Sequence, residues 1–268
     1  MQIIEIYDKS CNLKSNGKNV FKTMNSFLNK YPTEYRNLYD QNLLTLELFK
    51  CDELDDLLTG GMYDETNNIV YFVKSKYIGH ELFHMASTDR CVGVAAIESQ
   101  MDCEEGMIEG MTEYLFMKAF DLKGPTAYEF ETFAVDMLTN MPDLFKHYFI
   151  PNHSEFIKMF PNRKDIYNLI FAIATYHENY MAYLDYLCDE KRNPSIDSNV
   201  LKKSIRQVIN NLITIELSLE KENSQLKEYS SKFMDLIGSY EVADAISSLY
   251  PKYYEYAENQ VKNRILKR

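Results

Sequence analysis

The run from Gly79 to Met85 contains the pattern H-E-x-x-H, which constrains the fold more than any other part of this 268-residue chain. The pattern forms a site only in an α-helix, where His80 and His84 lie one turn apart on the same face and can bind one metal ion. Neutral imidazole is a good zinc ligand, and zinc lowers the pKa of a bound water toward ~7. Glu81 then lies beside the open coordination position, where its carboxylate can take a proton as the water attacks a carbonyl. The run therefore predicts a helix, one zinc ion and a hydrolytic reaction.

A chance match is the alternative, since a histidine on a helix is more often a capped or core residue than a ligand. The chain has only five histidines, and two of them stand at ligand spacing with a glutamate in the position of the base. The neighbouring residues are apolar or small, namely Leu82, Phe83, Met85 and Ala86. This composition is typical of a helix buried in a core, and it favours the functional interpretation.

A second predicted helix carries acids four residues apart at Glu105, Glu109 and Glu113. We expect Glu109 to be the third ligand, with Glu104 and Glu105 as alternatives. Gly110 beside it is expected to let this helix approach the histidine helix closely. Glu113, one turn further on, is expected to accept the spare N–H of a ligand histidine and to fix its tautomer. A solvated acidic face is the alternative, although three acids on one stripe repel each other unless a positive charge lies among them.

These motifs resemble the gluzincin zinc metallopeptidases, the broad group that includes thermolysin and the M1-type aminopeptidases. In that group a glutamate on a second helix is the third ligand, and an acid often follows four residues later. The resemblance implies that His80, His84 and Glu109 are the three zinc ligands. It also implies that Glu81 is the general base and that the carboxylate of Glu113 orients a ligand histidine. It covers roughly residues 60 to 120, and Ile108 stands where the group usually has asparagine before the ligand.

The segment from Gly60 to Val73 predicts two short strands around a polar turn, the second of them rich in β-branched and aromatic residues. In gluzincins a strand just ahead of the zinc helix forms the edge along which the substrate backbone pairs. By this resemblance Gly61, Met62 and Tyr63 are candidates for that edge. An ordinary hairpin that supports the helix is the alternative.

Catalysis of this kind also needs a donor for the developing oxyanion, commonly a tyrosine or histidine from outside the two zinc helices. His177 is the one downstream histidine inside a strong helical pattern, and Tyr176 and Tyr167 lie near it. Tyr128, shortly after the Glu109 helix, is a further candidate. Because the chain has 21 tyrosines, we expect most of these to be packing residues with a hydroxyl at the surface.

Composition excludes several other classes of function. The net charge is −11 and no basic patch of the nucleic-acid type is present, so we expect no nucleic-acid partner. The five scattered cysteines form no C-x-x-C pair, which indicates reduced thiols rather than a disulfide framework. The sequence shows neither the pattern of a signal peptide nor an apolar run of membrane-spanning length, so we expect a cytoplasmic protein with no membrane partner.

The pattern along the chain predicts an α+β fold in two parts. Residues 1–122 are expected to form a zincin-like catalytic region with a small mixed sheet, the histidine helix and the Glu109 helix. Residues 123–268 are expected to form a helical subdomain that closes the cleft, because glycine and proline are few. The periodicity predicts strands at 2–7 and 43–50, and a helix is the alternative for residues 43–50. It predicts helices at 18–30, 76–88, 104–121, 128–138, 161–188, 197–220, 222–237, 239–249 and 252–267.

We expect a zinc-dependent peptidase that hydrolyses peptide bonds with a zinc-bound water activated by Glu81. The alternative is a regulatory or scaffolding protein of the same fold that binds zinc and a protein partner with little turnover. The intact set of His80, Glu81 and His84 favours an active enzyme. The chain lacks the Gly-Ala-Met-Glu-Asn-like strand that marks many M1-type aminopeptidases, which favours endopeptidase or oligopeptidase action on peptide or protein substrates.

Overall fold

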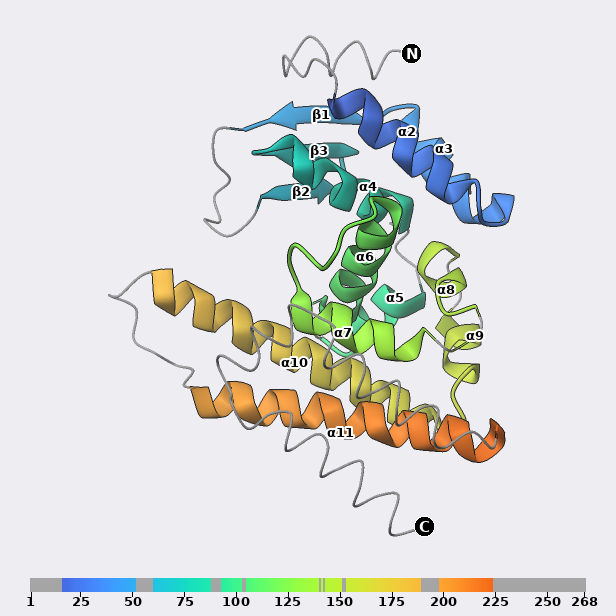
Figure 1. Ribbon diagram of the computed structural model, residues 1–268, viewed down its shortest axis with the longest axis vertical. Helices are drawn as coiled ribbons and strands as arrows, with labels where there is room; N and C mark the ends of the chain where they lie inside the picture. Colours follow the sequence, from blue (N-terminus) through green and yellow to red (C-terminus); the bar gives the residue numbers. More distant parts are fainter. Residues whose placement is uncertain are drawn as a thin grey trace.

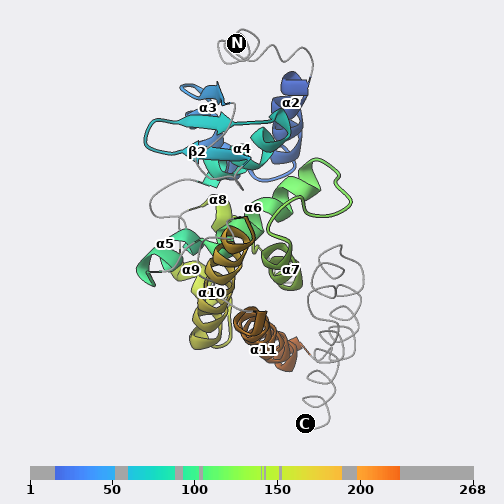
Figure 2. The same ribbon diagram turned by 90° about the vertical axis from the view of Figure 1, so that its left-hand side faces the viewer.

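The computed structural model describes residues 16–51, 60–87, 93–102, 105–139, 141, 143–150, 153–188 and 198–223. A small sheet lies at one end of the molecule, and two long helices, α10 (Arg163–Cys188) and α11 (Ser198–Asn223), lie at the other (Figure 1). The view turned by 90° shows the same separation (Figure 2). The predicted α+β class is therefore confirmed, and every element after residue 122 in the described part is a helix.

The sheet has three strands in the order β1-β3-β2, namely β1 (Glu47–Lys50), β2 (Gly61–Asp64) and β3 (Ile69–Phe72). β1 pairs in parallel with β3, and β2 pairs antiparallel with β3, so the predicted hairpin is confirmed. The strand predicted at 43–50 starts only at Glu47, because α3 (Asn37–Leu43) occupies the residues before it. Val70 and Phe72 of β3 and Leu48 of β1 are buried on one face, as expected for a sheet that covers a core on one side.

The histidine helix α4 (Ile78–Ser87) lies at the centre of the fold, after the 3-10 turn η2 (Ser75–Tyr77). The sheet, α2 (Asn16–Leu28) with α3, and α6 (Gly106–Ala119) contact it from different sides. Its apolar side chains are therefore fully buried, namely Ile78, Leu82, Phe83, Met85 and Ala86. An apolar face of this width is stable only in such an interior position.

The remaining helices are η1 (Thr33–Arg36), α5 (Gly93–Gln100), α7 (Glu129–Leu138), α8 (Lys146–Phe149) and α9 (His153–Lys158), in addition to the α10–α11 pair. Of these, α5, α7 and α10 contact α6 directly. Buried apolar side chains form one cluster that extends from Phe21 to Ile215. The boundary at residue 122 stays a prediction, and the strand at 2–7 and the helices predicted beyond residue 223 lie outside the described residues. In the described part, no helix combines the length and apolar character needed to span a membrane.

Candidate metal centre

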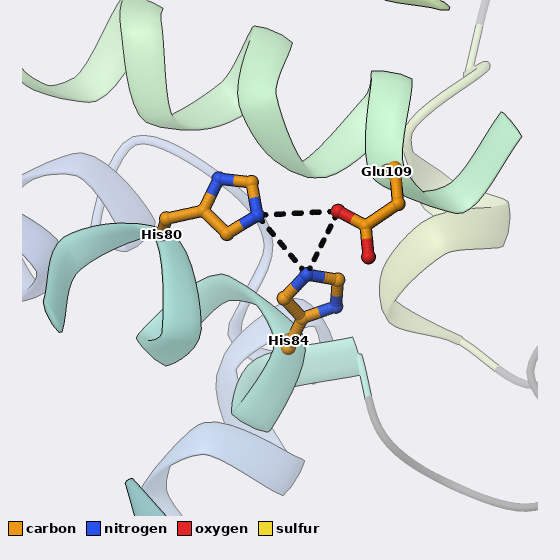
Figure 3. A group of neighbouring side chains, drawn as sticks. All are labelled: His80, His84 and Glu109. Atoms are coloured by element: carbon orange, nitrogen blue, oxygen red, sulfur yellow. Dashed lines mark hydrogen bonds and ion pairs between the residues drawn. The ribbon is translucent and has the colours of Figure 1, made fainter. Parts of the chain in front are cut away.

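The helix α4 brings the two histidines of the H-E-x-x-H pattern together as the helical period requires. The ring centroids of His80 and His84 are 4.9 Å apart, and their Nε2 atoms are 3.1 Å apart. Both rings extend from α4 toward α6, where Glu109 faces them (Figure 3). The local helix thus directs two imidazole nitrogens to one point.

Glu109, in the first turn of α6, is the third member of this group. Its Oε2 lies 3.2 Å from His80 Nε2 and 3.3 Å from His84 Nε2. The ligand atoms of the three side chains all lie within 4.8 Å of one another, so the group can hold a metal ion. Glu105 is exposed at the N-cap of α6 and is not a member of the group, and Glu104 lies outside the described residues.

Electrostatics favour a cation at this point. Burial alone would lower the pKa of His80, but hydrogen bonds to Glu109 and Glu113 outweigh it and raise that pKa to about 10. Burial alone would raise the pKa of Glu109, yet the two imidazoles hold it well below its usual range. The buried carboxylates therefore stabilise positive charge on the imidazoles.

Glu113 fixes the orientation of His80. One carboxylate oxygen of Glu113, which is fully buried on α6, lies 2.9 Å from His80 Nδ1. The other oxygen accepts hydrogen bonds from the backbone N–H and the hydroxyl of Thr126 and from the N–H of Ala127. A carboxylate so placed keeps a proton on Nδ1 and turns Nε2 toward Glu109.

Glu81 is buried between α4 and the edge of the sheet. A Cβ atom at Gly61 would lie 2.7 Å from Glu81 Oε1, so the glycine lets β2 lie directly against this carboxyl group. The backbone N–H of Tyr63 also hydrogen-bonds to the Glu81 carboxylate. Burial raises the pKa of Glu81, although the neighbouring imidazoles act in the opposite direction. Two residues of the predicted edge strand thus hold the candidate base.

A second buried histidine–carboxylate pair lies beside the metal-binding group. His177 Nδ1 on α10 is 2.9 Å from Glu131 Oε1 on α7. The ring of Tyr128 lies between the two sites, with its centroid 5.7 Å from that of His80 and 5.6 Å from that of His177. Burial and the charges of nearby carboxylates raise the pKa of Tyr128 far above its usual range, so its hydroxyl keeps its proton. Two of the predicted oxyanion donors therefore adjoin the metal-binding group.

The other two candidate donors make different contacts. Tyr176 is buried in the hydrophobic core, where its ring packs 4.5 Å from Phe130 and 5.7 Å from Tyr180. The hydroxyl of Tyr167 accepts a hydrogen bond from Arg163 at the start of α10. These contacts are typical of a core residue and a surface residue, and the catalytic role predicted for Tyr176 stays a prediction.

The expected role of Gly110 is wrong. A Cβ atom at Gly110 would lie 2.5 Å from the backbone oxygen of Glu131, so the glycine allows α6 to approach α7 and not α4. This contact lies next to the carboxylate that holds His177. Gly110 therefore helps to set the distance between the metal-binding group and the second histidine pair.

Sequence reasoning missed Glu98, Thr126 and Glu131. Glu98 is fully buried on α5, and its Oε1 accepts the N–H of Met107 at 2.6 Å, in the first turn of α6. Burial raises the pKa of Glu98 to about 8. For Glu98, the available signal was a single acid within an apolar helical run, whereas Glu131 shares its helix with Glu129 and Asp136 and gave no such signal. Thr126 lies in a loop and gave no such signal.

The centre thus combines three convergent donor atoms, a buried carboxylate at a strand edge, and an imidazole and a phenol at its side. Such a set can bind a divalent cation, accept a proton and donate hydrogen bonds to a developing negative charge. Comparisons of the chain with protein-family models, with curated proteins and with solved structures found no match.

Proposed function

We propose that this protein is a zinc-dependent metallopeptidase in which His80, His84 and Glu109 hold one zinc ion. The convergence of their donor atoms carries the proposal. Ligand atoms about 2.1 Å from a tetrahedral zinc ion lie about 3.4 Å apart, and the three separations here are 3.1, 3.2 and 3.3 Å. When bound, zinc lowers the pKa of a water molecule and polarises a carbonyl group.

In this proposal Glu81 is the general base. Its carboxylate accepts the proton of the attacking water and passes it to the leaving amine. Because burial raises the pKa of Glu81, the carboxylate is a stronger base than an exposed glutamate. The N–H of Tyr63 holds the carboxylate in place. The base is thus positioned by the sheet as well as by its own helix.

His177 and Tyr128 supply the hydrogen-bond donors for the oxyanion. The buried carboxylate of Glu131 lies 2.9 Å from Nδ1 of His177, and a protonated imidazole held there would donate from both nitrogens. Tyr128 keeps its phenolic proton and can donate it in a hydrogen bond. Donors of this kind typically contribute about 10²–10³ in rate.

The substrate binds as an extended peptide along β2. Val73 of the neighbouring chain segment donates its N–H to the carbonyl of Gly60. In an antiparallel pair, every second residue directs its backbone N–H and C=O to the same neighbouring strand. The backbone groups of Met62 therefore face β3, and those of Gly61 and Tyr63 face the open edge of β2, along which no other described strand pairs. Since Tyr63 N–H is bonded to Glu81, a peptide that adds to this edge runs directly past the base. An open edge suits internal cleavage of extended chains.

We further propose that residues 1–122 form a zincin-like catalytic region. The β2–β3 hairpin just ahead of α4 and the third donor on α6 support this assignment. The helices that follow carry His177 and Glu131, which is consistent with a helical subdomain that closes the site.

Metal analysis and peptide turnover of the wild type and of Glu81→Gln test the proposed function. We expect one zinc per chain in both proteins, and a turnover at least about 10² lower in the variant because the proton acceptor is lost. Absence of zinc from purified, zinc-supplemented protein would contradict the metal centre. Zinc binding with equal inactivity of both proteins would favour the scaffolding alternative.

The ligand assignment has its own matched pair of variants on α6. Glu109→Ala should lose zinc because one of three donors is removed, whereas Glu105→Ala should keep zinc because its side chain is exposed and outside the group. Bound zinc can be measured by elemental analysis after dialysis. The reverse result would move the third ligand to Glu105.

A further inference from the structure

An apolar row crosses the outer face of the sheet and ends at the open edge. The strand register aligns Phe49 of β1 with Tyr71 of β3, and Tyr71 with Met62 of β2. Residues that are paired in this way point to the same face of a sheet. Phe49 is 59% exposed, Met62 is 48% exposed, and the rings of Phe49 and Tyr71 are 5.9 Å apart. The row therefore lies on the solvent side, opposite the face that packs on the core.

The open edge of β2 continues this row into the proposed peptide site. Gly61 and Tyr63 direct backbone groups to that edge, and Met62 lies between them. A peptide residue opposite Met62 would form a non-hydrogen-bonded pair with it, in which side chains lie closest. Its side chain would point to the outer face, beside Met62, as the fourth member of the row.

We propose that the site selects extended peptides with a large apolar side chain at the position that pairs with Met62, an inference that rests on the proposed peptidase function. Cross-strand contact between apolar side chains stabilises strand pairing, and it removes the exposed part of Met62 from water. The peptide residues on either side of this position point to the opposite face. There Gly61 offers no side chain and Glu81 lies close by, while the ring of Tyr63 is already packed against the core and its hydroxyl donates to Asn68. The preference should thus be limited to one position.

Binding of nine-residue peptides to Glu81→Gln protein tests this proposal, because the variant is expected to bind without cleaving. A single leucine is moved through each position of an otherwise polar peptide, and affinity is measured by fluorescence anisotropy. We expect one position at which leucine binds roughly fivefold more tightly than serine. Adding Met62→Thr, which keeps a good strand former, should bring the leucine-to-serine ratio near one.

Leu44→Thr is the matched control, since Leu44 is 79% exposed but lies outside the sheet. It should keep the full preference. An equal affinity for all peptides, no peptide binding, or a preference that survives Met62→Thr would overturn the inference. A Met62-dependent preference in a wild type that cleaves nothing would instead support the inference and contradict the proposed peptidase function.

Discussion

Two histidine–carboxylate pairs lie side by side in this protein, and they differ in what surrounds them. His80 and His177 each place Nδ1 2.9 Å from a buried glutamate oxygen, that of Glu113 and Glu131 respectively. In the first pair, Nε2 of the histidine faces the other two metal-binding side chains. In the second pair, the histidine is outside any metal-binding group found among the described residues.

The carboxylates differ as well. Both oxygens of Glu113 are hydrogen-bonded, and the loop that provides the donors leads directly to Tyr128. In the described part of the chain, Oε2 of Glu131 is buried without a hydrogen-bond partner. A fully bonded carboxylate holds its histidine rigidly, whereas Oε2 of Glu131 is left able to accept a further hydrogen bond. Under the proposed function, the same pairing would orient a metal ligand in one place and a hydrogen-bond donor in the other.

The largest expected difference separates His80→Ala from His177→Ala. The first variant should lose both zinc and turnover, because one of three ligands is removed. The second should keep zinc and lose about 10²–10³ in kcat, because only a donor to the transition state is lost. Bound zinc and kcat are measured on the same preparations. Loss of zinc from His177→Ala would assign that histidine to the metal.

A smaller difference is expected between the two carboxylates. Glu113→Gln should weaken zinc binding about 10–100-fold, because the amide orients His80 less well than a carboxylate. Glu131→Gln should leave zinc affinity unchanged and lower kcat, because only the partner of His177 is altered. Competition with a chelator measures the affinity. Equal losses of zinc affinity in both variants would remove the distinction between the pairs.

The smallest expected effect is a pH dependence confined to the first pair in zinc-free protein. The pKa of His80 is raised from 6.5 to about 10 in the fold, so its contribution to stability is fully present below pH 6.5 and is lost as the pH rises toward 10. Thermal unfolding in chelator should therefore show a melting temperature lower by roughly 4–10 °C at pH 10 than at pH 6.5. Zinc-loaded protein is the control. Zinc competes with protons for the imidazoles and should remove most of this loss. An identical pH dependence with and without zinc would contradict the assignment.

Much of the site around His80 and Glu113 could be predicted from sequence, because it depends on residues that are close together in the chain. The period of the α-helix alone places His80 and His84 on one face, and the same period relates Glu109 to Glu113. The β-branched run at residues 69–73 and the polar turn before it likewise indicated the hairpin. The strand at Glu47 was less well bounded, because the four leucines between residues 43 and 48 suit a helix equally.

The second pair could not be found in this way. His177 and Glu131 are 46 residues apart, and their contact depends on how α7 and α10 pack against α6. The same holds for Gly110, whose neighbour is α7 rather than α4, and for Glu98, which binds the first turn of α6. Periodicity states which face of a helix is apolar, but it does not state which helix that face meets.

The sequence by itself determined the helix that carries H-E-x-x-H, the acidic stripe that supplies its partner, and the hairpin ahead of it. Each helix follows from residues within one or two helical turns, and the hairpin follows from residues around one tight turn. Over such short distances the geometry is set by the backbone. Only the tertiary structure decided that Glu109 rather than Glu105 meets the histidines, and that Tyr128 lies between His80 and His177. Close packing of separate helices fixes these contacts, because side chains remote in sequence meet only when the core is complete.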